Sequence, residues 1–104
     1  MAYAKALSVL ADPTRRAVFE ALRAGPRSVG EIAQGLPVSR PAVSQHLKVL
    51  KQANLVADEA RGTARIYRIH AEGLRDLRDW LDGFWDDALA SFKEFAERED
   101  DERD

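Results

Sequence analysis

The sequence predicts a small, mainly α-helical domain that contains one β-hairpin. Apolar residues recur at helical spacing in residues 39–55 and again from residue 71 onward. Between these segments lie residues 55–69, in which two stretches with β-branched and aromatic residues flank a turn-forming stretch. With 104 residues, 45% of them hydrophobic, the chain has the length and composition of a single domain with a modest core.

A capping box precedes the first clear helix signal. In the sequence Ser28-Val-Gly-Glu31, the serine side chain can accept a backbone N–H of the first turn while the glutamate returns to the cap residue. Gly35 is expected to adopt a left-handed conformation at the end of this short helix, and Pro37 to prevent its continuation. The apolar positions of the helix are Val29, Ile32, Ala33 and Leu36.

The next helix, over residues 39–53, separates its polar and apolar residues onto two sides. Ser39 is its expected N-cap, and Pro41 lies in its first turn. One side carries Ala42, Val43, His46, Leu47, Val49, Leu50 and Ala53, and the other carries Arg40, Ser44, Gln45, Lys48, Lys51 and Gln52. No acidic residue occurs between Glu31 and Asp58, which is typical of a helix that contacts phosphates and base edges.

Two helices joined by a few residues in this way predict a helix-turn-helix, with the second helix in the major groove. The alternative is an ordinary helical hairpin in a small bundle, in which an acid-free outer face is uncommon. The residues of this second helix that we expect to contact DNA are Ser39, Arg40, Pro41, Ala42, Ser44, Gln45, Lys48 and Lys51.

A hairpin follows this helix. Asn54 is expected to be a left-handed cap, residues 55–57 predict a short strand, residues 58–63 a turn and residues 64–69 a second strand. A basic hairpin directly after a recognition helix predicts the wing of a winged helix-turn-helix, with Arg61, Thr63 and Arg65 reaching phosphate or the minor groove. A solvated hairpin tip would explain Arg61 equally well but Arg65 and Arg68 less well.

Charge divides the chain into two parts. Residues 1–68 contain eleven Lys and Arg against five Asp and Glu, whereas residues 69–104 contain five against thirteen. The overall net charge of −2 is therefore the sum of a basic N-terminal part (residues 1–68, the front) and an acidic C-terminal part (residues 69–104, the back). This asymmetry predicts that the front contacts double-stranded DNA while the back faces away from it.

The last long helix, over residues 71–98, carries more aromatic residues than one small domain needs. We expect this surplus to face a second copy of the chain and, with the N-terminal helix, to form a dimer interface. The residues expected there are Tyr3, Leu7, Leu10, Leu77, Trp80, Leu81, Phe84, Trp85, Ala88 and Phe92. The alternative is a stripe that packs wholly within one subunit. Residues 1–98 are thus expected to form the domain, and residues 99–104 a disordered acidic tail.

Three segments resemble the ArsR family of bacterial winged-helix repressors: DPTRRAVFEAL, SVGEIAQGLPVSRPAVSQHLKVLKQANLV and GTARIYRI. They are similar, in order, to that family's second helix, its helix-turn-helix and its wing, and the resemblance covers residues 7–69 and extends to a long terminal helix. It implies a homodimer that binds an imperfect palindrome and represses transcription until an inducer loosens it.

Some members of the family sense metals or oxidants, so the residues at their ligand positions decide whether this chain could do the same. The family's metal pair in its third helix corresponds to residues 31–37, and this chain contains no cysteine. The family's other zinc site uses histidines and carboxylates of the terminal helix, but residues 72–104 contain no histidine. We therefore expect neither a metal site nor a cofactor, and leave open a small-molecule inducer.

Two classes of function fit these observations. The first is a sequence-specific, autoregulatory DNA-binding repressor, and the second is a winged-helix protein-interaction module that no longer reads DNA. An enzyme is disfavoured, because the chain has no glycine-rich phosphate loop and no nucleophile beside a base. The absence of a signal peptide or membrane-spanning stretch leads us to expect a cytoplasmic protein without a membrane partner.

Overall fold

Five helices and three strands make up residues 2–102, which are the residues that the computed structural model describes, with side-chain surroundings given for residues 3–100. In chain order they are α1 (Ala2–Leu10), α2 (Pro13–Glu20), β1 (Arg27–Ser28), α3 (Val29–Gln34), α4 (Arg40–Gln52), β2 (Val56–Arg61), β3 (Ala64–Ile69) and α5 (Ala71–Glu102). This element order confirms the predicted mainly helical fold with a hairpin after the second helix of a helix-turn-helix.

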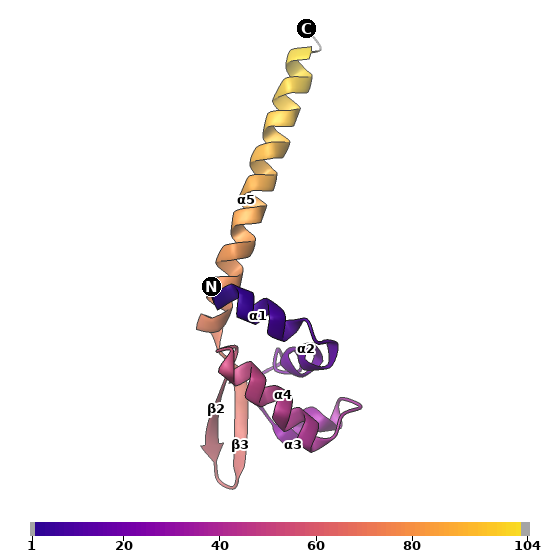
Figure 1. Cartoon of the computed structure of the whole chain (residues 1–104), viewed down its shortest axis with the longest axis vertical. Coiled ribbons are helices and arrows are strands. Elements are labelled where there is room, and N and C mark those ends of the chain that lie inside the picture. The colour runs from indigo at the N-terminus through magenta and orange to yellow at the C-terminus, as the bar shows by residue number, and fades with distance from the viewer. Residues whose placement is uncertain (1, 103–104) are drawn as a thin grey trace.

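The molecule is elongated, with a longest dimension of 72 Å, because α5 leaves the rest of the structure (Figure 1). Helices α1 to α4 form a body at one end of α5, and the β2–β3 hairpin projects from that body in the direction opposite to α5. The hairpin and α5 thus extend from opposite ends of the helical body.

The helix starts follow the local signals in the sequence. Ser28 Oγ accepts the backbone N–H of Glu31 at 3.2 Å, and the Glu31 carboxylate accepts that of Ser28 at 3.1 Å, which confirms the capping box. Ser39 caps α4 as predicted. The prediction for Gly35 was wrong, since its φ of −91° is right-handed. A tight turn, in which the Gly35 N–H bonds to the Ile32 carbonyl at 3.2 Å, ends α3 without a left-handed residue.

The sheet has three antiparallel strands in the order β1-β3-β2, one more than the predicted hairpin. Strand β1 has only two residues, which pair with Tyr67 and Ile66 of β3. The predicted turn over residues 58–63 was also wrong: β2 continues to Arg61, and the turn is limited to Gly62 and Thr63. Pairing of residues 58–61 with β3 outweighs the low strand propensity of Asp and Glu, and Gly62 supplies the positive φ of 64°.

The core lies where α4 crosses the other helices of the body. Val43, Leu47 and Leu50 of α4 are completely buried. The remaining buried side chains are Ala6, Val9, Val18, Phe19, Leu22, Ile32, Leu55 and Val56. Because one side of α4 is fixed against this core, its opposite side is held toward solvent.

Close backbone contacts join α5 to the body. Asn54 has the left-handed φ of 64° that its sequence position predicted, and the His70 N–H bonds to the Leu55 carbonyl at 2.9 Å. Gly73, in the first turn of α5, lies directly against the Asn54 carbonyl: a Cβ built at Gly73 would be only 1.7 Å from that oxygen. The direction in which α5 leaves the body is therefore set by contacts that admit no side chain at position 73.

Helix α5 continues to Glu102, past the boundary expected at residue 98, and residues 103–104 of the expected tail lie outside the described residues. The charged residues at this end favour a helix, as in the ion pair between Glu94 and Arg98, four residues apart, at 2.8 Å. Among the described helices, α5 included, we find none with both the length and the apolar character needed to cross a bilayer.

Candidate nucleic-acid interface

The outer side of α4 presents an uninterrupted polar surface. Ser44, Gln45 and Lys48 are all exposed, and each lies on the side of the helix opposite the buried Val43, Leu47 and Leu50. Their exposure follows from the packing of the inner side, since the two sets of residues alternate at helical spacing. This surface offers a hydroxyl, an amide and an ammonium group in adjacent positions, without a carboxylate on the helix itself.

The first residues of α4 have a structural task. The Ser39 hydroxyl accepts the Ala42 backbone N–H at 3.3 Å, and Pro41 occupies the first turn, where its missing N–H has no cost. Ala42 is half-buried, whereas Ser39 and Pro41 are exposed. Two of the predicted DNA-contacting residues thus also define where α4 begins and how it points.

A shallow cleft of about 320 Å³ brings together predicted residues from two distant segments. Arg40 of α4 shares this cleft with Thr63, Ala64 and Arg65 of the hairpin, and the rest of its lining comes from Ser28, Val29 and Gly30. The guanidinium of Arg40 lies against α3, where a Cβ at Gly30 would be 3.0 Å from it. Two arginines, Ser28 and Thr63 in one cleft form a surface suited to a phosphate of the DNA backbone.

The residue that sequence reasoning missed is Asp58 of β2. Its Oδ1 lies 2.8 Å from Lys51 Nζ, and its Oδ2 accepts a hydrogen bond from Arg65 at 2.9 Å. The Asp58 side chain is only 7% exposed, against 54% for Lys51 and 55% for Arg65. Two of the cations predicted to contact DNA are therefore bound to a carboxylate of the same subunit.

These contacts keep Asp58 ionised. The hydrogen bond from Lys51 is the largest cause that lowers its pKa below the ordinary value, burial acts in the opposite direction, and Arg65 lowers the pKa further. The sequence contained one signal for this arrangement. Asp58 lies two residues after the buried Val56, and in a strand residues two apart point to the same face, which here is the face toward α4. The prediction that Asp58 lies in a turn concealed this signal, because side chains do not alternate between two faces in a turn.

Arg61, at the end of the hairpin, is much less constrained. Its guanidinium lies 3.8 Å from the carboxylate of Glu59, and the side chains of Arg61 and Glu59 are 75% and 58% exposed. An exposed pair at this distance contributes little to stability. Arg61 is therefore available to an external partner at little conformational cost.

The residues predicted to form the dimer interface divide into three groups. Tyr3 of α1 stacks on Trp80 with ring centroids 5.3 Å apart, and Trp80 meets Phe84 edge-on at 4.9 Å. Leu10 packs against the core of its own subunit, and Leu77 is half-buried. The third group is exposed and consists of Leu7 (39%), Leu81 (52%), Trp85 (68%), Phe92 (71%) and Ala88; Phe84 of the first group is also 58% exposed. Leu89 and Phe95, with 54% and 60% exposure, extend the apolar stripe on α5.

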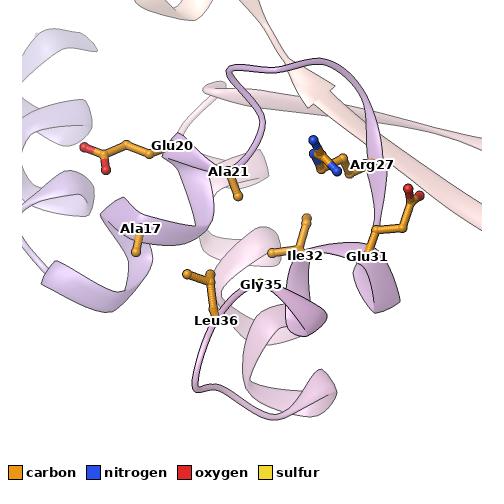
Figure 2. Close-up of a pocket in the computed structure, with 8 residues that line it drawn as sticks. All are labelled: Ala17, Glu20, Ala21, Arg27, Glu31, Ile32, Gly35 and Leu36. Atoms are coloured by element: carbon orange, nitrogen blue, oxygen red, sulfur yellow. The ribbon is translucent and has the colours of Figure 1, made fainter.

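A separate hollow of about 470 Å³ lies between α2 and α3 (Figure 2). Its apolar lining comes from Ala17, Ala21, Ile32 and Leu36. Figure 2 shows Arg27 and Glu31 near each other at one end of it, while Glu20 points away. Because the Glu31 carboxylate already serves the capping box, this hollow offers no free cluster of polar ligands. Within residues 2–102 we find no group of three or more His, Cys, Asp or Glu side chains arranged to hold a metal ion.

The chain is similar to known helix-turn-helix proteins. Residues 10–59 match the family model described as a helix-turn-helix domain. The chain is 53% identical over 98 residues to the HTH-type transcriptional regulator Rv2034 of Mycobacterium tuberculosis, covering 94% of this chain and 92% of that protein. It is 35% identical over 75 residues to the transcriptional repressor SdpR of Bacillus subtilis, covering 72% and 83%.

A solved structure shares the fold. It is the solution structure of the homodimeric winged helix-turn-helix DNA-binding domain of Mb0332 from Mycobacterium bovis, described as a possible ArsR-family transcriptional regulator. The TM-score is 0.66 at 28% sequence identity, and the match covers 85% of this chain and 82% of that one. The chain therefore shares its fold with a domain that is described as DNA-binding.

Proposed function

The chain belongs to the ArsR family of helix-turn-helix transcriptional regulators, and on that premise we propose that it is a repressor that binds an inverted repeat in double-stranded DNA as a homodimer. In this role α4 reads the major groove and the β2–β3 hairpin follows the flanking backbone. Its action would lie in the cytoplasm, where bacterial DNA is, and would require no enzymatic step.

The observation that carries this proposal is the exposed, acid-free outer side of α4 next to the cleft that contains Arg40 and Arg65. An α-helix fits the width of the major groove, and the arginines in the cleft beside α4 are of the type that binds phosphates of the flanking backbone. The same surface would be an unusual choice for binding a protein partner, because it has few apolar atoms to bury.

The homodimer is supported by the apolar stripe of α5. Large side chains such as Trp85 and Phe92 are mostly exposed in the single subunit, and exposed apolar stripes of this size mark association surfaces. A second copy offers the same stripe, which suits a symmetric interface. Two readers held together then favour an operator of two inverted half-sites.

We further propose that the repressor is autoregulatory and does not sense metals. The absence of cysteine from the chain removes the thiolate ligands that zinc, copper and arsenic prefer. An inducer, if one acts on this protein, would then be a small molecule without metal character.

The test is binding to DNA under a salt titration. Fluorescence anisotropy with a random duplex of about three helical turns should show affinity that falls steeply with salt, because each neutralised phosphate releases counterions. Selection from a pool of randomised duplexes should then enrich an inverted repeat, here called the selected duplex. A protein-interaction module without a DNA role would bind neither duplex in a salt-dependent manner.

Gln45→Ala should relax sequence preference at one position of each half-site. The glutamine amide is exposed on α4 and can pair with both the acceptor and the donor of adenine in the major groove, worth about 1–3 kcal/mol. Competition binding against single-base variants of the selected duplex measures this effect. Lys48→Gln, one turn away, is the matched control and should weaken all sequences alike. If Gln45→Ala reduced the affinity for the selected and the random duplex equally, this side chain would contact the DNA backbone and not a base.

A further inference from the structure

The wing and the recognition helix are held together through one carboxylate. Asp58 on β2 reaches Lys51 in the last turn of α4 with one oxygen and Arg65 on β3 with the other, at 2.8 and 2.9 Å. Three elements therefore meet at a side chain that is itself almost completely covered. Among the described residues, Asp58 is the acid that contacts two of the cations expected to face DNA, whereas Glu59 lies 3.8 Å from one such cation, Arg61.

The sheet register explains why this contact forms. Asp58 pairs with Tyr67, and Arg65 lies two residues from Tyr67 along β3, so Asp58 and Arg65 point to the same face of the sheet. That face is also the one on which Tyr67 packs against the core beneath α4. The hairpin could not rotate or slide relative to α4 without separating these charges.

The contact also reduces the charge that a DNA backbone would meet. Lys51 and Arg65 each retain free N–H donors and more than half of their exposure, but their two positive charges share one negative charge. Binding to random DNA depends almost entirely on the number of phosphates that are neutralised, whereas binding to a specific site depends in addition on fixed geometry. A carboxylate at this position is expected to weaken binding to random DNA and to support binding to a specific site.

We propose that Asp58 is a specificity-determining positioning residue, which holds the wing against the recognition helix and withholds Lys51 and Arg65 from non-specific phosphate contacts. This inference rests on the proposed function as a DNA-binding repressor. It adds that discrimination between operator and random DNA depends on a residue that does not touch a base.

The test compares Asp58→Asn with Glu59→Gln in the full chain. Both changes remove one negative charge from β2 and preserve side-chain shape, but Glu59 is exposed and lies 3.8 Å from Arg61. With Asp58→Asn, affinity for the random duplex should rise roughly eightfold at about 0.1 M salt for each additional phosphate that the protein neutralises, with a steeper salt dependence. The preference for the selected duplex should fall about fivefold or more. Glu59→Gln should change both affinities about twofold or less.

Two outcomes would overturn the inference: equal effects of the two variants, or an Asp58→Asn protein whose preference for the selected duplex is unchanged. A wild-type protein that binds neither duplex would instead overturn the proposed function. If Asp58→Asn does not fold, as judged by circular dichroism, Lys51→Gln and Lys48→Gln provide the decision. Because Lys51 shares its charge with Asp58, its loss should reduce the salt dependence clearly less than the loss of Lys48, and equal reductions would refute the proposal.

Discussion

Replacing Trp85 and Phe92 together by glutamine should convert the protein into a folded monomer whose affinity for the selected duplex is about 100-fold lower or worse. Both side chains lie on the exposed stripe of α5, with 68% and 71% of their surface accessible in one subunit, so their loss removes little from the subunit's own core. Large aromatic residues dominate association energies. Two linked DNA-binding domains bind with an affinity that exceeds the affinity of one domain alone by a factor of about 10²–10⁴.

Sedimentation velocity measures the oligomeric state, and anisotropy with the selected and random duplexes measures binding. The weak, salt-sensitive binding to the random duplex should be retained, because the outer side of α4 is unchanged. The matched control is Asp86→Asn with Glu97→Gln on the opposite side of the same helix, which should leave the dimer intact. A double glutamine variant that remains dimeric and binds normally would show that this stripe is not the interface.

Gly73→Ala should destabilise the domain by about 1–3 kcal/mol, in spite of the higher helix propensity of alanine. The added methyl group would overlap the Asn54 carbonyl oxygen and the adjoining backbone, so either α5 or the left-handed turn at Asn54 has to move. Backbone atoms on both sides of the contact leave no flexible side chain to yield. A shift here would also change the direction of α5 and with it the spacing of two recognition helices.

Gly83→Ala is the control of opposite sign. Gly83 lies in the middle of the same helix, and nothing lies within 4 Å of the position of its Cβ. Alanine there should stabilise the protein by about 0.5–1 kcal/mol through helix propensity. Urea unfolding of both variants, monitored by circular dichroism, gives the comparison. A Gly73→Ala protein as stable as Gly83→Ala would show that the junction with Asn54 tolerates a side chain.

Most parts of the fold that follow from contacts close in sequence were predicted from sequence alone, although the left-handed conformation expected at Gly35 was not found. The capping box of Ser28 and Glu31, the cap at Ser39, the two sides of α4 and the left-handed Asn54 all depend on residues within about one helical turn. The same local patterns led to the family, because the helix-turn-helix and wing are contiguous segments. They also identified the exposed residues of α4 that the proposed function uses.

Tertiary structure decided what depends on residues far apart in the chain. Strand β1 exists because Arg27 and Ser28 pair with Tyr67 and Ile66 of β3, and no pattern two residues long can predict a strand. The length of β2 and the burial of Asp58 result from the register with β3 and the position of α4 above it. Helix periodicity indicated the apolar stripe of α5, but its exposure follows from the course that α5 takes from Gly73. A sequence determines which side of an element is apolar; packing between distant elements determines which charges meet and which surfaces remain open.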